Sequence, residues 1–218
     1  MSKASLNLPV LLSRATHRRI RTLFIRAALW KHGLTKAHTI PSFTAREELE
    51  ALYTLAQNCP PDARVLEVGS YVGASTCYLA AGLRGAHPSI TCLDTWNNET
   101  MPDGTRDTLA EFERNVRPVR QNLTLIQKAS SDVSKEDLGS AFNLVFLDGD
   151  HSYRQTRADF ELVQDRVALE GILAFHDSLF FEGVSRVIGE ALASGKWQIG
   201  GTVRNLFWIL PAKFSHSS

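Results

Sequence analysis

Beyond Pro61 the sequence alternates short apolar runs with segments of helical spacing, and this alternation limits the fold more than any other feature of the chain. Strands that lie parallel in one sheet need a crossover, usually a helix, between each pair. The apolar runs predict strands at 64–68, 90–93, 123–129, 143–147 and 171–175, and a closing antiparallel pair at 197–199 and 203–210. Helical spacing predicts helices at 103–116, 134–138, 152–167 and 182–193. The sequence therefore predicts an α/β fold built on a parallel sheet.

The charged residues divide the chain into two segments. The formal net charge is +1, with 24 Lys+Arg and 23 Asp+Glu, but residues 1–46 hold nine basic residues and no acid. The rest of the chain carries 15 basic residues against all 23 acids, a net charge of −8. Because such different segments favour different partners, we expect a basic arm at residues 1–43 and a separate, acidic domain at residues 44–218.

The arm has the spacing of an amphipathic helix between Arg18 and His32. Its arginines lie largely off one apolar face, which comprises Ile20, Leu23, Phe24, Ala27 and Ala28, with Trp30 close to it. Thr44 and Glu47 predict a capping box for the helix that follows. Four roles of the arm stay open: contact with an anionic membrane surface, packing on a partner subunit in a homo-oligomer, a lid, and an organellar transit segment.

The number and spacing of the cysteines indicate the redox state of the cellular compartment in which the protein works. Cys59, Cys77 and Cys92 are odd in number and lack short spacings, which disfavours a disulfide framework and a cysteine-based zinc site. Unpaired cysteines are typical of a reducing compartment, so we expect a cytoplasmic protein. No apolar stretch approaches the roughly 20 residues that span a bilayer, so we expect any membrane contact to be peripheral.

Residues 65–76, VLEVGSYVGAST, have the pattern of a strand that ends in a tight glycine turn and opens a helix. At Gly69 and Gly73 a backbone without Cβ atoms lets a ligand approach the N–H groups of a helix N-terminus. Glu67 is placed to face a cationic amine, and Asp94, at the end of the next strand, is placed to bind ribose hydroxyls. A plain strand-to-helix turn is the alternative. A short-chain oxidoreductase is disfavoured because none of the tyrosines has a lysine four residues later.

A second group of polar side chains follows two later strands. These residues come directly after the strand at 143–147 or at the end of the strand at 171–175, and they are Asp148, Asp150, His151, His176 and Asp177. The carboxyl ends of adjacent parallel strands share one crevice, so we expect the five side chains to converge there.

With these motifs the chain resembles the class I S-adenosylmethionine-dependent methyltransferases. The resemblance covers roughly residues 47–211 and rests on LEVGSYVG, CLDTW, FNLVFLDGDHSY and GILAFHD. The last two segments resemble the O-methyltransferase branch that includes relatives from the macrocin and cephalosporin pathways. The resemblance implies that residues 44–218 form a Rossmann-like, doubly wound sheet of seven strands, mostly parallel with an antiparallel last strand.

The same resemblance implies that the chain binds S-adenosylmethionine. The glycine turn would pass under the methionyl part of the cofactor, with Glu67 near its amine and Asp94 on the ribose. Residues that follow the strand at 123–129 would border the adenine. The expected cofactor-binding residues are Glu67, Gly69, Ser70, Gly73, Asp94, Ser131, Asp132 and Asp148.

Metal-dependent relatives carry one acid after the fourth strand and two adjacent acids after the fifth, and the matching positions here are Asp148, His176 and Asp177. A histidine in place of an acid shifts the preference from Mg toward Mn, Fe or Zn, so we expect a divalent ion, either Mg, Mn or Fe. Such an ion lowers the pKa of the acceptor hydroxyl. We expect His151 to act as general base, with Asp150 as second choice. Without a metal, the same side chains would contact the cofactor or hydrogen-bond neighbouring loops.

These inferences favour O-methylation of a small-molecule acceptor with a hydroxyl group. A second hypothesis is a binding protein that keeps the fold without catalysis, because Tyr71 replaces the middle glycine of the turn motif and a histidine replaces a metal-binding acid. A third is a nucleic-acid methyltransferase that uses the basic arm. The third is disfavoured because the expected active face is acidic and no Asn-Pro-Pro-Tyr or Asp-Pro-Pro-Tyr motif occurs.

Overall fold

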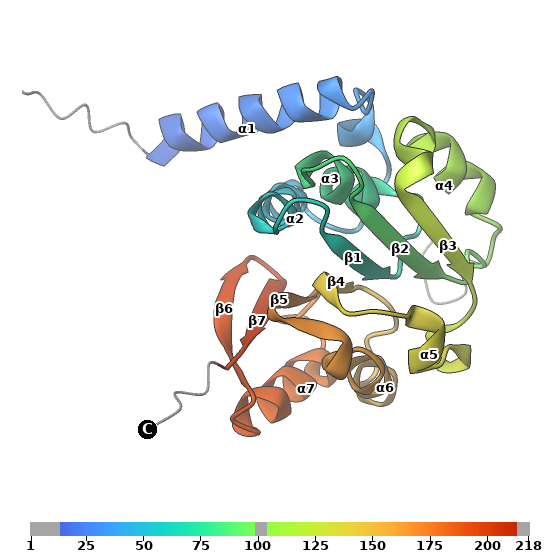
Figure 1. Cartoon of the computed structure of the whole chain (residues 1–218), viewed down its shortest axis with the longest axis vertical. Helices are drawn as coiled ribbons and strands as arrows, with labels where there is room; N and C mark the ends of the chain where they lie inside the picture. Colours follow the sequence, from blue (N-terminus) through green and yellow to red (C-terminus); the bar gives the residue numbers. More distant parts are fainter. Residues whose placement is uncertain (1–13, 99–103, 213–218) are drawn as a thin grey trace, which may run out of the picture.

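The computed structural model describes residues 14–98 and 104–212, and their side chains from residue 19 onward (Figure 1). Its α-helices are α1 (Arg14–Lys31), α2 (Arg46–Asn58), α3 (Ala74–Gly82), α4 (Leu109–Val116), α5 (Lys135–Leu138), α6 (Tyr153–Val163) and α7 (Glu182–Ala193). Its strands are β1 (Arg64–Val68), β2 (Ser89–Asp94), β3 (Leu123–Gln127), β4 (Phe142–Leu147), β5 (Val167–Phe175), β6 (Trp197–Val203) and β7 (Leu206–Pro211). Short 3-10 helices lie at Ala37–Thr39, Arg117–Asn122, Ser130–Asp132 and Gln164–Arg166.

The strands form one seven-stranded sheet in the order β3-β2-β1-β4-β5-β7-β6. β1 to β5 pair in parallel, and β7 is antiparallel to both β5 and β6. The chain runs outward from β1 to β3 on one side and outward from β4 on the other, so β1 and β4 flank a topological switch point. Ligands bind outside the carboxyl ends of the strands at such a point. The expected Rossmann-like, mostly parallel seven-stranded sheet is confirmed.

The central strands end at the same level. In the register, Val68 of β1 is opposite Leu93 of β2 and Leu147 of β4, and Leu147 is opposite Phe175 of β5. The loops that follow these four strands therefore meet at one edge of the sheet. This register brings the glycine turn after β1 next to the polar residues after β4 and β5.

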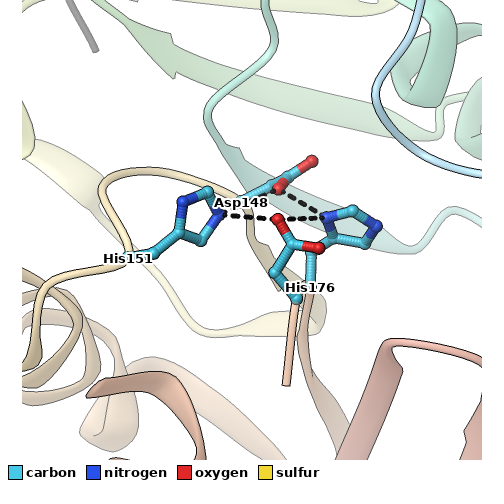
Figure 2. Close-up of side chains that lie close together, drawn as sticks. Asp148, His151 and His176 are labelled. Carbon is cyan, nitrogen blue, oxygen red and sulfur yellow. Dashed lines mark ion pairs between the residues drawn. The ribbon is translucent and has the colours of Figure 1, made fainter. Parts of the chain in front are cut away.

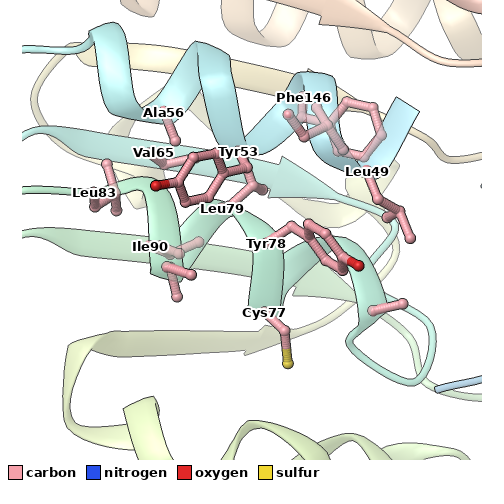
Figure 3. Packing of buried hydrophobic residues seen from close by; sticks show 14 of the residues in the cluster. Leu49, Tyr53, Ala56, Val65, Cys77, Tyr78, Leu79, Leu83, Ile90 and Phe146 are labelled. Carbon is pink, nitrogen blue, oxygen red and sulfur yellow. The ribbon is translucent and has the colours of Figure 1, made fainter. Parts of the chain in front are cut away.

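Helices cover both faces of the sheet, with α1 to α4 on one side and α5 to α7 on the other (Figure 1). β4 contributes to both layers, because Leu144 and Phe146 belong to the core under α2 and α3 (Figure 3), while Val145 and Leu147 belong to the core under α6 and α7. Alternate side chains of a strand point to opposite faces, and a parallel strand covered on both sides is apolar throughout. That requirement explains the unbroken apolar run at 144–147.

The arm is docked on the domain by α1. Ile25 and Leu29, one turn apart, are 2% and 3% exposed and belong to the same core as α2 and α3. The hydroxyl of Thr22 donates to Glu50 of α2 at 2.9 Å, and the guanidinium of Arg21 lies 3.3 Å from the same carboxylate. The described part of the arm therefore packs on the domain rather than standing apart from it.

The apolar face expected from the spacing of α1 points to solvent instead. Leu23 is 64% exposed, Phe24 69% and Trp30 73%. α1 thus carries two apolar lines, and the domain covers the one with Ile25 and Leu29. Within the described residues, no helix combines the length and the apolar character that crossing a bilayer demands.

The predicted cap of α2 is wrong by one residue. The N-cap is Ala45, whose N–H donates to the side chain of Glu48 at 2.7 Å, in place of the expected pair Thr44 and Glu47. Glu48, at the third position of the helix, is buried and 1% exposed.

Several other boundaries differ from the sequence prediction; β5, for example, begins at Val167 in place of residue 171. The helix expected at 103–116 begins at Leu109, because the preceding backbone bonds back to the loop after β2; residue 103 lies outside the described residues. Arg204 and Asn205, expected inside a closing strand, form the turn between β6 and β7, and Arg204 adopts φ 53° there. The closing antiparallel pair itself is confirmed.

Candidate functional site

A cavity of about 410 Å³ opens at the carboxyl ends of the strands. Its walls come from the turns after β1, β2, β3, β4 and β5, and from residues 42–44, which join the arm to α2. The two polar groups expected from the sequence, the glycine turn and the residues after β4 and β5, therefore share one cavity.

The glycine turn is packed against the end of β4. Gly69 has φ +86°, and a Cβ at this position would overlap the carbonyl oxygen of Asp148. The N–H of Gly69 donates to the carbonyl of Leu93 at 2.9 Å. Because glycine alone tolerates both the dihedral angle and the close approach, Gly69 fixes the loops after β1, β2 and β4 relative to one another.

Asp94 closes the turn with both carboxylate oxygens. Oδ2 accepts the N–H groups of Ser70 at 2.7 Å and Tyr71 at 2.8 Å, and Oδ1 accepts the N–H of Trp96 at 2.6 Å. Asp94 and Ser70 both line the cavity. Each carboxylate oxygen has two lone pairs, so Asp94 keeps acceptor capacity toward the cavity. Its contact with a ribose stays a prediction.

Two expected cofactor residues, Glu67 and Gly73, lie behind the cavity wall. Glu67 is fully buried, and its Oε2 accepts the hydroxyls of Ser70 at 2.7 Å and Thr76 at 2.5 Å. Among the described residues, Glu67 Oε1 has no hydrogen-bond partner. Burial raises the pKa of Glu67 to about 7, against hydrogen bonds from neighbouring hydroxyls that lower it. Gly73 caps α3 and packs on α4.

Of the two residues expected beside the adenine, both of which follow β3, only one is found among the described lining residues of the cavity. Ser131 lines the cavity, whereas Asp132 is exposed and is not among the described lining residues. The sequence reasoning missed Ser130 and Gln155, which also line the cavity; Ser130 donates to Asp159 at 2.6 Å and accepts from Gln155 at 2.9 Å. The adjacent serines at 130 and 131, directly after β3, were the feature of the sequence that could have pointed to Ser130.

Asp148, His151, His176 and Asp177 form the acid–histidine cluster, in which one ligand atom of each lies within 4.8 Å of the others (Figure 2). His176 Nδ1 lies 3.0 Å from Asp148 Oδ1 and 3.5 Å from Asp177 Oδ2. His151 Nε2 lies 3.2 Å from Asp177 Oδ2 and 3.9 Å from Asp148 Oδ1. The 3.2 Å approach is not aligned as a hydrogen bond, so His151 Nε2 is a buried nitrogen without an aligned partner among the described residues.

Asp150 lines the cavity but stands outside the acid–histidine cluster. Its carboxylate accepts the N–H of Ser152 at 2.7 Å at the start of α6. Burial would raise the pKa of Asp150, but the hydrogen bonds from Ser152 lower it overall. A lowered pKa makes a weaker base, which favours His151. The ring of His151 stacks on Phe181, with centroids 4.4 Å apart.

Glu48 is a member of the site that the sequence reasoning missed. Its Oε2 lies 3.1 Å from His176 Nε2, and its Oε1 accepts the N–H of Asn205 at 2.8 Å. Glu48 and His176 are both buried. The feature of the sequence that could have pointed to it is an acid three residues after the N-cap of α2.

The carboxylates around His176 determine its charge. Burial alone would lower the pKa of His176, but the charge of Asp148 and hydrogen bonds with Asp148, Asp177 and Glu48 raise it to about 12. Burial alone would raise the pKa of Asp148, but the charge of His176, its close contact at 3.0 Å and the nearby His151 ring lower it to about 2. Within this set of side chains, His176 is an imidazolium between three carboxylates.

The donor set of the acid–histidine cluster fits a divalent ion. Glu48 engages Nε2 of His176, which leaves Nδ1 facing Asp148 and Asp177. Metal-ligating histidines commonly have such a carboxylate on their second nitrogen. Two imidazoles and two carboxylates suit Mn, Fe or Zn better than Mg.

Aromatic residues line the outer part of the cavity. Phe43, which joins the arm to α2, packs on Tyr71 of the glycine turn with ring centroids 5.8 Å apart. The predicted domain boundary between residues 43 and 44 therefore falls within the cavity wall. Lining residues on loops commonly determine which ligand is accepted.

Comparisons with known proteins agree with this architecture. A family model described as a methyltransferase domain matches residues 66–178, just over half of the chain. No curated protein matches the sequence. The Podospora anserina methyltransferase PaMTH1, solved with S-adenosylhomocysteine, is 14% identical, with 98% of this chain and 100% of that chain covered and a TM-score of 0.63.

Two O-methyltransferase structures resemble this chain to a similar degree. The Bacillus cereus enzyme, in complex with S-adenosylhomocysteine, is 15% identical, with 89% of this chain and 94% of that chain covered and a TM-score of 0.60. The O-methyltransferase NovP is 13% identical, with 90% and 99% covered and a TM-score of 0.62. At these identities the likeness establishes the fold.

Proposed function

Because this chain belongs to the methyltransferase-domain family and is an S-adenosylmethionine-dependent methyltransferase, we propose that it methylates a hydroxyl group of a small molecule. The observation that carries the proposal is the shared cavity, in which the glycine turn and the acid–histidine cluster face each other. The structural neighbours that are O-methyltransferases support this acceptor class. The narrower likeness to macrocin- and cephalosporin-pathway relatives rests on the sequence motifs.

The cofactor side of the cavity is formed by Ser70, Asp94 and Ser131. S-adenosylmethionine supplies a methyl group on a cationic sulfur. Asp94 holds the turn and offers the remaining lone pair of Oδ1 to a ribose hydroxyl, and Ser131 borders the adenine. Glu67 acts from behind the wall by orienting the hydroxyl of Ser70. The partnerless Oε1 of Glu67 is consistent with a polar group arriving there when the cofactor binds.

The acceptor side is formed by the acid–histidine cluster. His151 takes the proton of the acceptor hydroxyl, and Asp177, 3.2 Å from His151 Nε2, stabilises the resulting imidazolium. A divalent ion held by Asp148, His176 and Asp177 would lower the pKa of that hydroxyl and stabilise the developing oxyanion. Stacking on Phe181 keeps the ring of His151 directed into the cavity.

Cofactor binding tests the first half of the proposal. We expect calorimetry to show saturable binding of S-adenosylmethionine and none of NAD. Asp94→Ala should weaken this binding by about tenfold or more, because the turn loses three hydrogen bonds to one carboxylate. Asp132→Ala, an exposed aspartate near the same edge, is the matched control and should change affinity by less than about twofold. Equal losses in the two variants would contradict the role of Asp94.

Metal binding is tested separately. We expect equilibrium dialysis to show one bound Mn²⁺ that Asp177→Ala removes, and we expect a chelator to abolish turnover. Asp150→Ala is the matched control, because it removes a carboxylate that lines the cavity but lies outside the acid–histidine cluster. This variant should retain the ion. Full turnover in chelator would remove the metal from the mechanism without affecting cofactor binding.

Activity distinguishes the remaining alternatives. Methyl transfer that His151→Ala abolishes would exclude a non-catalytic binding protein. The nucleic-acid alternative remains disfavoured because three carboxylates surround His176 at the cavity. A cytoplasmic location remains our proposal and is supported by the three cysteines, each of which is a buried free thiol.

A further inference from the structure

The outward face of α1 combines apolar and basic side chains. Leu23, Ala27 and Trp30 follow the i, i+4, i+7 spacing of one helix face and are all exposed, with Phe24 beside them. This face lies opposite the line of Ile25 and Leu29 that docks α1 on the domain, and α1 forms the periphery of the molecule (Figure 1). Exposed aromatic and aliphatic side chains gathered on one face mark an interaction surface, whereas scattered ones do not.

Basic side chains border the same face. Arg19 and Arg26 lie along one edge and Lys31 lies at the C-terminal end, and all three are exposed. Residues 1–46 contain no acid, and the carboxylates of Glu47 and Glu50, which line a pocket together with Arg19, belong to α2. The outward face of α1 is therefore complementary to a surface that is apolar inside and anionic outside.

We propose that the outward face of α1 docks the protein on an anionic lipid surface. Leu23, Phe24 and Trp30 enter the boundary between headgroups and acyl chains, where tryptophan is favoured. The long stems of Arg19 and Arg26 lie along this apolar face while their guanidinium groups reach the lipid phosphates. The helix lies in the plane of the interface, with Ile25 and Leu29 still packed on the domain.

A second copy of the chain fits this face less well than a lipid surface. Two α1 helices that met through the same face would bring Arg19, Arg26 and Lys31 of one copy toward those of the other. A symmetric contact pairs a patch with itself, so the like charges would repel without a carboxylate between them. Charge complementarity therefore selects an anionic partner.

Vesicle sedimentation of the full chain tests the proposal. We expect binding to vesicles of phosphatidylcholine with about one third phosphatidylserine, and at least about tenfold weaker binding to phosphatidylcholine alone, since each basic residue near an anionic surface contributes roughly fivefold. Raising the salt concentration should weaken the binding further. A double variant, Phe24→Ser with Trp30→Ser, should reduce binding by at least about tenfold and keep the thermal stability of the wild type, because both side chains are exposed.

The matched control changes an equally exposed apolar residue elsewhere. Leu169 of β5 is 91% exposed, and Leu169→Ser should leave vesicle binding unchanged. Absence of binding to anionic vesicles at low salt, or binding that the double variant does not reduce, would overturn the proposal. A dimer in analytical ultracentrifugation that the double variant dissociates, with no vesicle binding, would assign the face to a second copy instead.

Discussion

Replacing Gly69 with alanine should lower the free energy of unfolding by about 3 kcal/mol or more and abolish binding of S-adenosylmethionine. The added Cβ would meet the carbonyl oxygen of Asp148, and the backbone at φ +86° is strained for any residue with a side chain. The carbonyl of Asp148 is a backbone group and cannot rotate away as a side chain can. The clash is therefore relieved only if the loops after β1 and β4 separate. Urea denaturation and calorimetry measure the two effects.

Gly189→Ala is the matched control. Gly189 lies inside α7, and no described atom lies within 4 Å of a Cβ built there. A glycine in a helix interior costs about 0.5–1 kcal/mol relative to alanine, so this variant should be slightly more stable than the wild type. If the two alanine variants unfolded at the same urea concentration, the close approach at Gly69 would contribute nothing to the free energy of unfolding.

Replacing Glu48 with alanine should destabilise the protein by about 3–5 kcal/mol, because removing one partner of a buried ion pair leaves the other uncompensated. Glu48 accepts from His176 and from the N–H groups of Ala45 and Asn205, and the variant loses all three interactions. Glu113→Ala is the control. Glu113 of α4 is half exposed, and its ion pair with Arg120 is 3.9 Å long, so the free energy of unfolding should change by less than about 0.5 kcal/mol.

The loss in Glu48→Ala should also depend on pH. The pKa of His176 is raised from 6.5 to about 12 in the folded protein, so the stabilisation from its protonated form is complete below about pH 6.5 and is lost as the pH rises toward 12. Without Glu48 this pKa is lower, so the fall in stability with rising pH should level off at a lower pH in the variant than in the wild type. The comparison is made in chelator, so that no ion displaces the proton. Parallel pH profiles would contradict the assigned partnership of Glu48 and His176.

The fold was predictable because its signals are local. Apolar runs of five or six residues separated by helical spacing specify a covered parallel sheet, and Leu144 to Leu147 supply both cores as such a strand must. Because the ends of parallel strands meet, the sequence also predicted that Asp148, His151, His176 and Asp177 would converge, and their ligand atoms do. Their chemical roles stay predictions.

Residues whose placement depends on distant packing were not predictable. Glu48 joins His176 across 128 positions of the sequence, so no local pattern pairs the two residues. On α1 the sequence contains two apolar lines, and hydrophobic spacing alone does not say which one the domain covers. Asp150 lines the cavity, but its carboxylate accepts the N–H of Ser152 at the start of α6, and Asp132 is exposed.

The position of the cavity wall has a consequence for comparing this enzyme with its relatives. The family model ends at residue 178 and begins at residue 66, yet Phe43 and Phe181 line the cavity and Glu48 holds His176 from outside those limits. Two members that are alike over the matched residues can therefore differ in the aromatic walls of the cavity. The flanking segments therefore supply part of the cavity wall that the family match does not describe.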